Sequence, residues 1–538
     1  MDAVTHVPAP INETVLDYAP GSPERAALEV ALVELSGTKH DLPHTIGGVR
    51  VEGKGPRLEV RQPHAHAKVL GVTRGATKTE AAAAVDAAVA AAPAWRDMAF
   101  DDRAAILLKA ADLLAGPWRA KINAATMLGQ SKTAYQAEID AACELIDFWR
   151  FNVHFARQII AEQPPANSRG LWNRSDYRSL EGFVYAVTPF NFTAIAGNLP
   201  TAPALMGNTV VWKPSHSQQL AAQLTMELLE EAGMPPGVIN MVNGHGREVS
   251  EVALAHPEFA GLHFTGSTAV FQGLWQQIGA NLTGYRHYPR IVGETGGKDF
   301  VLAHPSADPD VLRTALIRGA FEFQGQKCSA ASRAYVPRSV WKVIKKDLVE
   351  LTNGLSVGDV TDLSNFIDDR AFAKHKAAID RAHATSHLDV VAGGTYDDSV
   401  GYFVRPTIVE STDPSDEMFT TEYFGPILAV HVYPDRQYAK VLEQMESVAP
   451  YALTGAIIAQ DRAVVADALH RLRFAAGNFY INDKPTGAVV GQQPFGGGRA
   501  SGTNDKAGSA ANLLRWTSVR SIKENFVPPT QHTYPHMG

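Results

Sequence analysis

The chain has 538 residues, of which 45% are hydrophobic and 20% charged, with 44 Gly and 32 Pro. This profile predicts a globular protein of about two to four domains and excludes collagen-like and largely disordered chains. The net charge of -7 argues against nucleic acid or an anionic membrane surface as the main partner.

The cysteine content and the apolar stretches indicate the cellular compartment in which the protein is expected. The sequence has two cysteines, Cys143 and Cys328, too few for a disulfide framework or a four-cysteine zinc site, which indicates a reducing compartment. Residues 1–20 lack the basic start and apolar run of a secretory signal. The most apolar stretch, residues 81–95, contains Asp86 and Pro93 and predicts a helix outside a membrane. We therefore expect a cytoplasmic protein with no integral membrane contact.

The N-terminal part of the chain predicts an extended arm with edge strands, followed by helices. Short β-favouring pieces stand at residues 57–60 and 68–72. His64 and His66 have no acidic or thiol partner nearby in sequence, so we expect no metal site there. Residues 77–157 favour helices, and Thr77 is a suitable N-terminal cap for the first of them.

Four acidic residues lie within a predicted helix at residues 133–151, namely Glu138, Asp140, Glu144 and Asp147. Their mixed helical spacing favours a solvated face for most of them. Pro and Gly residues then interrupt the pattern between residues 164 and 170. The polar segment that follows, up to Gly182, predicts a projecting hairpin.

From Gly182 onward, short apolar runs alternate with helical stretches, a pattern typical of parallel sheets in α/β proteins. The runs in the first block are residues 183–187, 209–212, 238–242 and 261–264. They predict a nucleotide-binding sheet, and a second block at residues 301–490 repeats the pattern with runs such as 333–336 and 427–432. The late apolar run at residues 513–519 predicts a strand that pairs with the hairpin of another subunit.

Cys328 stands where the second α/β block opens, within Gly325-Gln326-Lys327-Cys328-Ser329. Small flanking residues allow a tight turn, and the ammonium of Lys327 would favour the thiolate that nucleophilic chemistry requires. A free cysteine is more often a small buried hydrophobe, so a nucleophile has to be supported by further motifs.

Four such motifs follow predicted strands, where α/β proteins hold their ligands. They are Pro189-Phe190-Asn191, Trp212-Lys213-Pro214-Ser215, Phe264-Thr265-Gly266-Ser267 and Glu294-Thr295-Gly296-Gly297-Lys298. The Asn191 amide suits an oxyanion, with a turn residue as the alternative, and the Lys213 ammonium suits ribose hydroxyls. A helix that starts after Ser267 has free N–H groups for a phosphate. Glu294 suits a general base if burial raises its pKa.

Together with Glu422-Tyr423-Phe424-Gly425-Pro426, these motifs resemble, in the same chain order, the NAD(P)-dependent aldehyde dehydrogenase superfamily. The segment from Ile481 to Lys506 resembles the signature loop of L-glutamate γ-semialdehyde dehydrogenases, also called Δ1-pyrroline-5-carboxylate dehydrogenases. The resemblance implies an α/β aldehyde dehydrogenase fold in three parts. These are a Rossmann-like NAD-binding domain (1–163 and 182–297), a catalytic α/β domain (298–498), and a small β oligomerisation flap (164–181 and 509–538).

The resemblance also implies roles for single residues. Cys328 would attack the aldehyde, Asn191 would stabilise the oxyanion, and Glu294 would activate the water that hydrolyses the thioester. NAD would be held by Lys213, Pro214, Ser215, Gly266, Ser267, Glu422 and Phe424. The substrate would contact Phe192, Lys327, Ser329, Gly487, Ala488 and Phe495, with Glu144 facing its α-ammonium group.

Two residues depart from the pattern of the relatives that the chain resembles. Ala488 stands where relatives often have Ser, which removes one hydrogen bond to the substrate carboxylate. His216 stands where many NAD-preferring relatives have an acid, which leaves the choice between NAD and NADP open.

The expected activity is oxidation of L-glutamate γ-semialdehyde to L-glutamate, the second step of proline catabolism. The alternatives are a dehydrogenase of another carboxylated semialdehyde and an NAD-independent thiol esterase; a non-catalytic scaffold is disfavoured because every motif position is filled. The family pattern implies a homo-oligomer with a dimer as its basic unit. The chain length leaves no room for a proline-oxidising domain, so any contact with a proline dehydrogenase would join separate chains.

Overall fold

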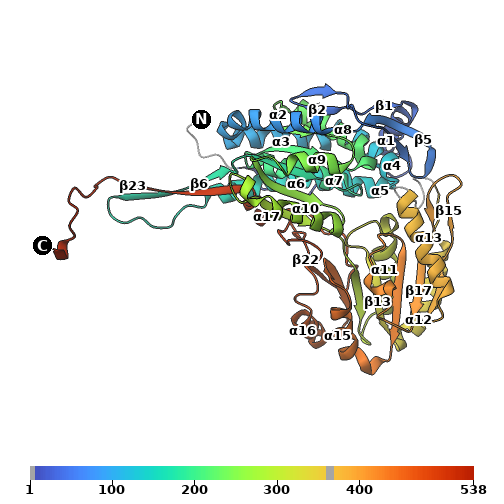
Figure 1. The fold of residues 1–538 in the computed structure, drawn as a ribbon. Helices are drawn as coiled ribbons and strands as arrows, with labels where there is room; N and C mark the ends of the chain where they lie inside the picture. Colours follow the sequence, from blue (N-terminus) through green and yellow to red (C-terminus); the bar gives the residue numbers. More distant parts are fainter. Residues whose placement is uncertain (1–6, 359–368, 538) are drawn as a thin grey trace.

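The computed structural model describes residues 7–358 and 369–537, which form two α/β blocks and one projecting two-stranded ribbon (Figure 1). Each block is built on a seven-stranded sheet. The N-terminal block and the middle of the chain form the upper body in Figure 1, and residues from about 300 to 480 form the lower body. The two predicted α/β domains are thus both present.

The first sheet has the strand order β11-β10-β7-β8-β9-β2-β3. Its five parallel strands are β7 (Phe183–Val187), β8 (Thr209–Lys213), β9 (Ile239–Met241), β10 (Phe259–Thr265) and β11 (Arg290–Glu294). Two short strands, β2 (His44–Ile46) and β3 (Val49–Val51), close one edge in antiparallel fashion. Nearly every residue of β7, β8 and β10 is buried, which explains why these strands are continuous apolar runs.

The second sheet has the order β14-β17-β18-β13-β12-β20-β21. Its strands are β12 (Asp299–Ala303), β13 (Ala331–Pro337), β14 (Leu388–Ala392), β17 (Thr407–Ser411), β18 (Ile427–Tyr433), β20 (Thr454–Ile458) and β21 (Asn478–Ile481). All neighbours pair in parallel except β14, which runs antiparallel to β17. Helices α11 (Pro309–Phe321), α12 (Arg338–Gly354), α13 (Asp369–Ala384), α15 (Tyr438–Val448) and α16 (Arg462–Arg471) complete this block.

Helix α1 (Pro23–Gly37) lies in the segment for which the sequence predicts an extended arm, so that prediction is wrong there, whereas the next helix begins where predicted. Thr77 caps α2 (Lys78–Asp97) in a capping box. The Glu80 carboxylate accepts a hydrogen bond from the backbone N–H of Thr77. The helices that follow are α3 (Phe100–Ala115), α4 (Arg119–Gln130), α5 (Ala134–Ala137), α6 (Glu144–Ala161), α7 (Thr193–Leu205), α8 (Gln219–Ala232), α9 (Gly246–Ala253) and α10 (Thr268–Ala280). Between α5 and α6 lies η1 (Glu138–Cys143), a π-helical turn that widens an otherwise continuous helix.

The projecting ribbon corrects the predicted hairpin. Residues 164–181 form no hairpin of their own: β6 (Leu171–Ser179) pairs antiparallel with β23 (Thr517–Asn525) of the same chain over nine residues each. The two strands extend away from the body (Figure 1). The C-terminal strand thus finds its partner within its own chain, and Leu513 and Leu514, expected in that strand, belong to helix α17 (Ala510–Leu514).

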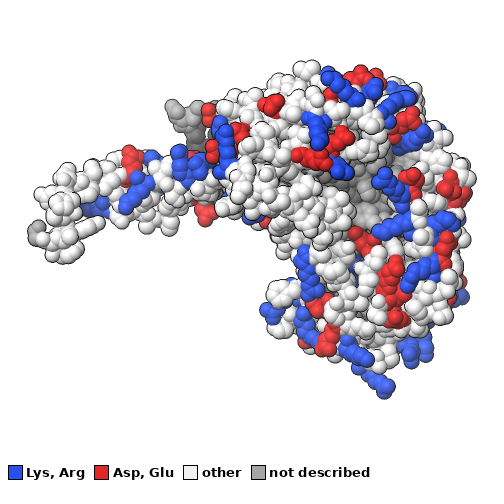
Figure 2. Space-filling model, in the orientation of Figure 1, with Lys and Arg blue, Asp and Glu red and all other residues white. Residues whose placement is uncertain are grey.

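The charged side chains on the face drawn in Figure 2 are interspersed, with basic and acidic groups side by side. Among residues 7–358 and 369–537, no helix combines the length and the apolar character needed to cross a membrane.

Candidate active site

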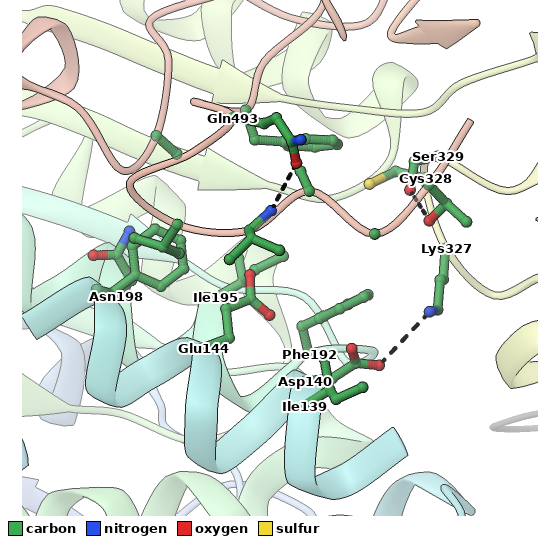
Figure 3. A pocket seen from close by; sticks show the side chains of 18 of the residues that line it. Ile139, Asp140, Glu144, Phe192, Ile195, Asn198, Lys327, Cys328, Ser329 and Gln493 are labelled. Atoms are coloured by element: carbon green, nitrogen blue, oxygen red, sulfur yellow. Dashed lines mark hydrogen bonds and ion pairs between the residues drawn. The ribbon is translucent and has the colours of Figure 1, made fainter. Parts of the chain in front are cut away.

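A cavity of about 750 Å³ brings together residues from both α/β blocks and from the loop after β21 (Figure 3). Nine of the ten residues expected to act in catalysis or substrate binding line it. They are Cys328, Glu294, Phe192, Lys327, Ser329, Gly487, Ala488, Phe495 and Glu144. These residues are spread over 352 positions of the chain, from 144 to 495, so the fold itself assembles the cavity.

Cys328 follows a short 3-10 turn, η4 (Glu322–Gly325), that closes α11. Phe323 and Gln324 in this turn are left-handed, with φ of 48° and 51°. Burial, with the nearby carboxylates of Glu294 and Asp299, raises the pKa of Cys328 well above its ordinary value. The expectation that Lys327 favours the thiolate is therefore wrong for this structure, because its ammonium turns away toward Asp140 and Glu322.

Asn191 lies next to the cysteine loop although it does not line the cavity. Its side-chain Nδ2 donates a hydrogen bond of 2.9 Å to the carbonyl oxygen of Gln326, two residues before Cys328. The side chain is 4% exposed, so solvent does not compete for the bond. An Asn amide carries two donor hydrogens, and this bond uses one of them.

Glu294 ends β11 and faces the cavity. Burial raises its pKa to about 8, with a smaller opposing effect from Lys506. A carboxyl group with a pKa near neutrality is suited to take a proton from water.

Gly296 and Gly297 lie so close to other parts of the chain that there is no room for a Cβ at either position. A Cβ on Gly296 would lie 2.1 Å from a carboxylate oxygen of Glu422, and a Cβ on Gly297 would lie 2.2 Å from the carbonyl oxygen of Cys328. The Gly-Gly pair therefore lets one loop lie directly against both the nucleophile and Glu422.

The loop after β21 forms another wall of the cavity. Gly487 has a φ of 93°, a conformation that favours glycine, and exposes its backbone beside Ala488. The hydroxyl of Ser329 lies 2.7 Å from that of Thr486, immediately before Gly487. The backbone N–H groups of such a loop suit a carboxylate ligand.

Charged side chains line one side of the cavity. Asp140 and Lys327 point toward each other in Figure 3, with Nζ of Lys327 4.0 Å from the carboxylate. The buried ammonium of Lys132 lies 2.6 Å from the same carboxylate. Burial acts to raise the pKa of Asp140, but the two cations hold it below its ordinary value. Burial and the adjacent Asp140 charge raise the pKa of Glu144 well above its usual range.

The predicted solvated acidic face on this helix is wrong. Glu138, Asp140 and Asp147 are 0%, 5% and 4% exposed. Glu138 is paired with Arg119, and Asp147 accepts from Asn12 and from the backbone of Glu13. The acids are buried because cations and N–H groups of other segments partner them.

The residues expected to hold a dinucleotide lie at the carboxyl ends of the first sheet's strands, where open α/β sheets bind ligands. Ser267 caps α10 and is exposed, so the first N–H groups of that helix can face an anion. Lys213 ends β8, and burial lowers its pKa to about 8. No side-chain hydrogen bond or ion pair of Lys213 is found within residues 7–358 and 369–537.

The second block contributes Glu422 and Phe424 to this region. Glu422 accepts from the backbone N–H of Gly297 at 2.8 Å. The ring of Phe424 lies 5.8 Å from that of Phe190 in an edge-to-face arrangement. Pro214 and Ser215 follow Lys213 directly, and Gly266 precedes Ser267. A Cβ on Gly266 would lie 2.8 Å from the ring of Phe264. The donor set fits the phosphates and hydroxyls of a dinucleotide.

A sequence model described as the aldehyde dehydrogenase family matches residues 50–522. The chain belongs to the aldehyde dehydrogenase family. The fold is thus that of a member of this family, as the sequence motifs predicted.

Several aldehyde dehydrogenase relatives resemble the chain over its full length. The Δ1-pyrroline-5-carboxylate dehydrogenase of Dictyostelium discoideum is 47% identical over 99% of this chain and 97% of its own. A crystal structure of the Mycobacterium tuberculosis Δ-pyrroline-5-carboxylate dehydrogenase bound with NAD is 63% identical, covers 100% of both chains and has a TM-score of 0.97. Proline utilization A from Bdellovibrio bacteriovorus is 29% identical over 97% of this chain and 54% of its own, with a TM-score of 0.90.

Sequence reasoning missed three residues that shape the cavity of this aldehyde dehydrogenase. Thr486 partners Ser329, and Asp140 joins Lys132 to Lys327. Thr486 stands within the recognised loop, so its place beside Gly487 could have been noticed. Lys132 and Asp140 carry no local signal, because only the packing of α4 against the π-helical turn brings them together.

Proposed function

We propose that this protein oxidises L-glutamate γ-semialdehyde, the open form of Δ1-pyrroline-5-carboxylate, to L-glutamate with NAD, as the second step of proline catabolism. The observation that carries the proposal is one cavity that holds a cysteine, a glutamate of raised pKa and a glycine-containing loop suited to a carboxylate. The relatives named Δ1-pyrroline-5-carboxylate dehydrogenase support it.

In this proposal Cys328 is the nucleophile. Its thiol gives its proton to solvent water, the sulfur forms a bond to the aldehyde carbon, and the carbonyl oxygen becomes the oxyanion of a thiohemiacetal. The backbone N–H of Cys328 and the second hydrogen of the Asn191 amide stabilise that oxyanion. Removal of one such donor costs about 3 kcal/mol in comparable sites.

The thiohemiacetal has to lose a hydride to become a thioester on Cys328, and NAD, held by the residues named below, would supply the acceptor. Glu294 takes a proton from water, and the hydroxide attacks the thioester carbon. The carbon–sulfur bond breaks, the carboxylic acid is released, and the sulfur regains a proton. Glu294 needs its carboxylate form for this step.

NAD would be bound along the carboxyl ends of the first sheet. Ser267 and the start of α10 face its phosphates, while Lys213 and Glu422 hold ribose hydroxyls. The remaining proposed contacts are Pro214, Ser215, Gly266 and Phe424. Among residues 7–358 and 369–537 the Lys213 ammonium has no side-chain partner, and the exposed Ser267 opens the N-terminus of α10; both features suit this role.

The substrate would lie with its α-carboxylate on the backbone of Gly487 and Ala488 and on the hydroxyl of Ser329. Phe192 and Phe495 contact the aliphatic stem, and Lys327 contributes positive charge to the same wall. Glu144 receives the α-ammonium group. Its pKa is raised by burial and by the Asp140 charge, and an incoming ammonium would favour ionisation.

We also propose the domain boundaries given above and a homodimer as the basic unit, with the flap (164–181 and 509–538) at the subunit contact. Exposed apolar side chains on the ribbon, including Trp172 and Val519, favour such a contact. Both cysteines are free, which favours the reducing cytoplasm. Proline utilization A is about twice as long as the segment that this chain matches. Because this match points to proline oxidation, we propose transient contact with a proline dehydrogenase on a separate chain.

Turnover with a substrate panel, measured with NAD and with NADP in parallel, tests the proposed activity. Glutamate γ-semialdehyde should be oxidised much faster than succinate semialdehyde or simple aliphatic aldehydes. Comparable rates across the panel would refute the substrate, and ester cleavage without a nicotinamide cofactor would favour the esterase alternative. Cys328→Ala should abolish turnover and keep NAD binding, whereas Cys143→Ala, which alters the other cysteine, should remain active.

A further inference from the structure

Lys132 is a fully buried cation close to the cavity but outside its lining. Its side chain is 0% exposed. It stands between α4 and α5, where Ser131 ends α4 in the left-handed conformation (φ 54°) and Thr133 caps α5 with a capping box. The backbone on both sides of Lys132 is thus held in a defined turn.

The ammonium of Lys132 has three partners. Nζ lies 2.6 Å from a carboxylate oxygen of Asp140, 4.0 Å from the ring centre of Phe192 and 4.2 Å from the ring centre of Phe323. Cation–π contacts strengthen when they are desolvated, and all four side chains are buried. The ammonium therefore connects two rings that come from different parts of the chain.

The two rings belong to the two catalytic segments. Phe192 directly follows Asn191 and precedes α7, and Phe323 lies five residues before Cys328 in η4. We propose that Lys132 is a positioning residue for the oxidation: held by Asp140, its ammonium fixes the Asn191 segment to the Cys328 loop through the rings of Phe192 and Phe323.

The Cys328 loop needs such support because its backbone is unfavourable. Phe323 and Gln324 are both left-handed, and a bulky residue adopts that conformation only when its surroundings hold it there. Phe323 is 0% exposed beneath the Lys132 ammonium. The hydrogen bond from Asn191 to Gln326 is the other link between the two segments. Lys132 and this bond together define the distance from oxyanion donor to sulfur.

Asp140 extends the arrangement to the cavity wall. It faces Lys132 on one side and Lys327, the neighbour of Cys328, on the other. The π-helical turn η1 carries Asp140, and turns of this kind occur frequently at functional sites. The Lys132–Asp140 pair thus contacts the loop at Phe323 and again at Lys327.

The test compares Lys132→Met, Lys132→Arg and a control, Arg103→Met. Arg103 is also a buried cation, but its guanidinium donates to backbone carbonyls such as that of Leu205, and it lies outside the cavity lining. Because misplacement by about 1 Å can cost roughly 100-fold in rate, Lys132→Met should lower kcat about 10- to 100-fold and leave the Kd of NAD unchanged. Lys132→Arg should recover a large part of the loss, and Arg103→Met should keep kcat within about twofold.

The kcat comparison rests on the proposed function, so a second readout is independent of the substrate. Hydrogen–deuterium exchange of the peptide covering Glu322 to Cys328 should be at least about threefold faster in Lys132→Met than in wild type, and unchanged in Arg103→Met. Inactivity of the wild type toward the semialdehyde would refute the proposed function without altering this readout.

Phe323→Leu, which keeps the ion pair and removes one ring, covers the case in which Lys132→Met fails to fold. It should lower kcat and accelerate exchange in the same peptide. A kcat within twofold of wild type in either variant, together with unchanged exchange of the loop, would overturn the positioning role.

Discussion

The side-chain amide of Asn191 donates to the carbonyl oxygen of Gln326 over 2.9 Å and so joins the start of α7 to the loop that carries Cys328. Because Asn191 is 4% exposed, its second amide hydrogen has no solvent competitor. The bond fixes the position of the proposed oxyanion donor in the absence of substrate. Such preorganisation is the condition for electrostatic stabilisation of a transition state.

Asn191→Ala should lower kcat about 100- to 1,000-fold, since one oxyanion donor is lost. Steady-state kinetics with glutamate γ-semialdehyde measure this effect. Asn281→Ala serves as the control because the Asn281 amide donates to Leu254 outside the cavity. A drop of less than about threefold in Asn191→Ala would contradict the assigned role.

The pH dependence of deacylation should follow Glu294. Its pKa is raised to about 8, chiefly by burial, so the carboxylate predominates only above that pH. The hydrolysis rate of the Cys328 thioester should therefore rise from pH 6 to pH 9 and then level off. Rapid-quench measurement of the acyl-enzyme reports the rate directly. Glu294→Gln should accumulate acyl-enzyme at every pH, and an unchanged profile in that variant would assign the base elsewhere.

The raised pKa of Glu294 also makes the free energy of unfolding depend on pH. The pKa of Glu294 is higher in the folded chain than its ordinary value, so the folded state binds the proton more tightly. This contribution is complete below the ordinary pKa near 4.5 and is lost as the pH rises through about 8. Glu294→Gln should accordingly raise the Tm relative to wild type at pH 9 and leave the difference small near pH 4, below the ordinary pKa.

The sequence was sufficient for the strands and for recognition of the family because both depend on local signals. Buried parallel strands are short apolar runs, as at β7 and β8, and the Cys328, Glu294 and Asn191 motifs each occupy a few consecutive residues. The prediction that these motifs meet in one cavity is confirmed for Cys328 and Glu294.

The predictions that the structure corrects depend on contacts between segments that are far apart in the sequence. Charge and spacing suggested a solvated acidic face. In the structure Glu138 pairs with Arg119, and Asp140 pairs with Lys132. No sequence pattern within the helix indicates that these two cations lie beside it. The effect of Lys327 on Cys328 was misjudged because the direction of its side chain depends on Asp140. The partner of β23 was misplaced because strand pairing over more than 300 residues leaves no trace in either segment.

Recognition of the α-ammonium group should depend on Glu144. Glu144→Gln removes the charge and keeps the shape, so the KM for glutamate γ-semialdehyde should rise about 10-fold, as expected for loss of a hydrogen bond to a charged group. The kcat/KM for propionaldehyde, which has no amino group, should stay within about twofold of wild type. An equal loss for both aldehydes would indicate damage to the cavity and would contradict the ammonium contact.

Substrate affinity should also respond to Ala488, which stands beside Gly487 in the loop proposed to bind the α-carboxylate. Ala488→Ser adds a hydroxyl donor at this wall and should lower the KM for glutamate γ-semialdehyde about three- to tenfold, because one hydrogen bond to a charged group is gained. The kcat should change little, since the carboxylate lies away from the reacting carbon. Val489→Thr, which adds a hydroxyl at the exposed neighbouring position, is the matched control and should leave KM unchanged. If both variants lower KM equally, or if neither does, the α-carboxylate is bound elsewhere in the cavity.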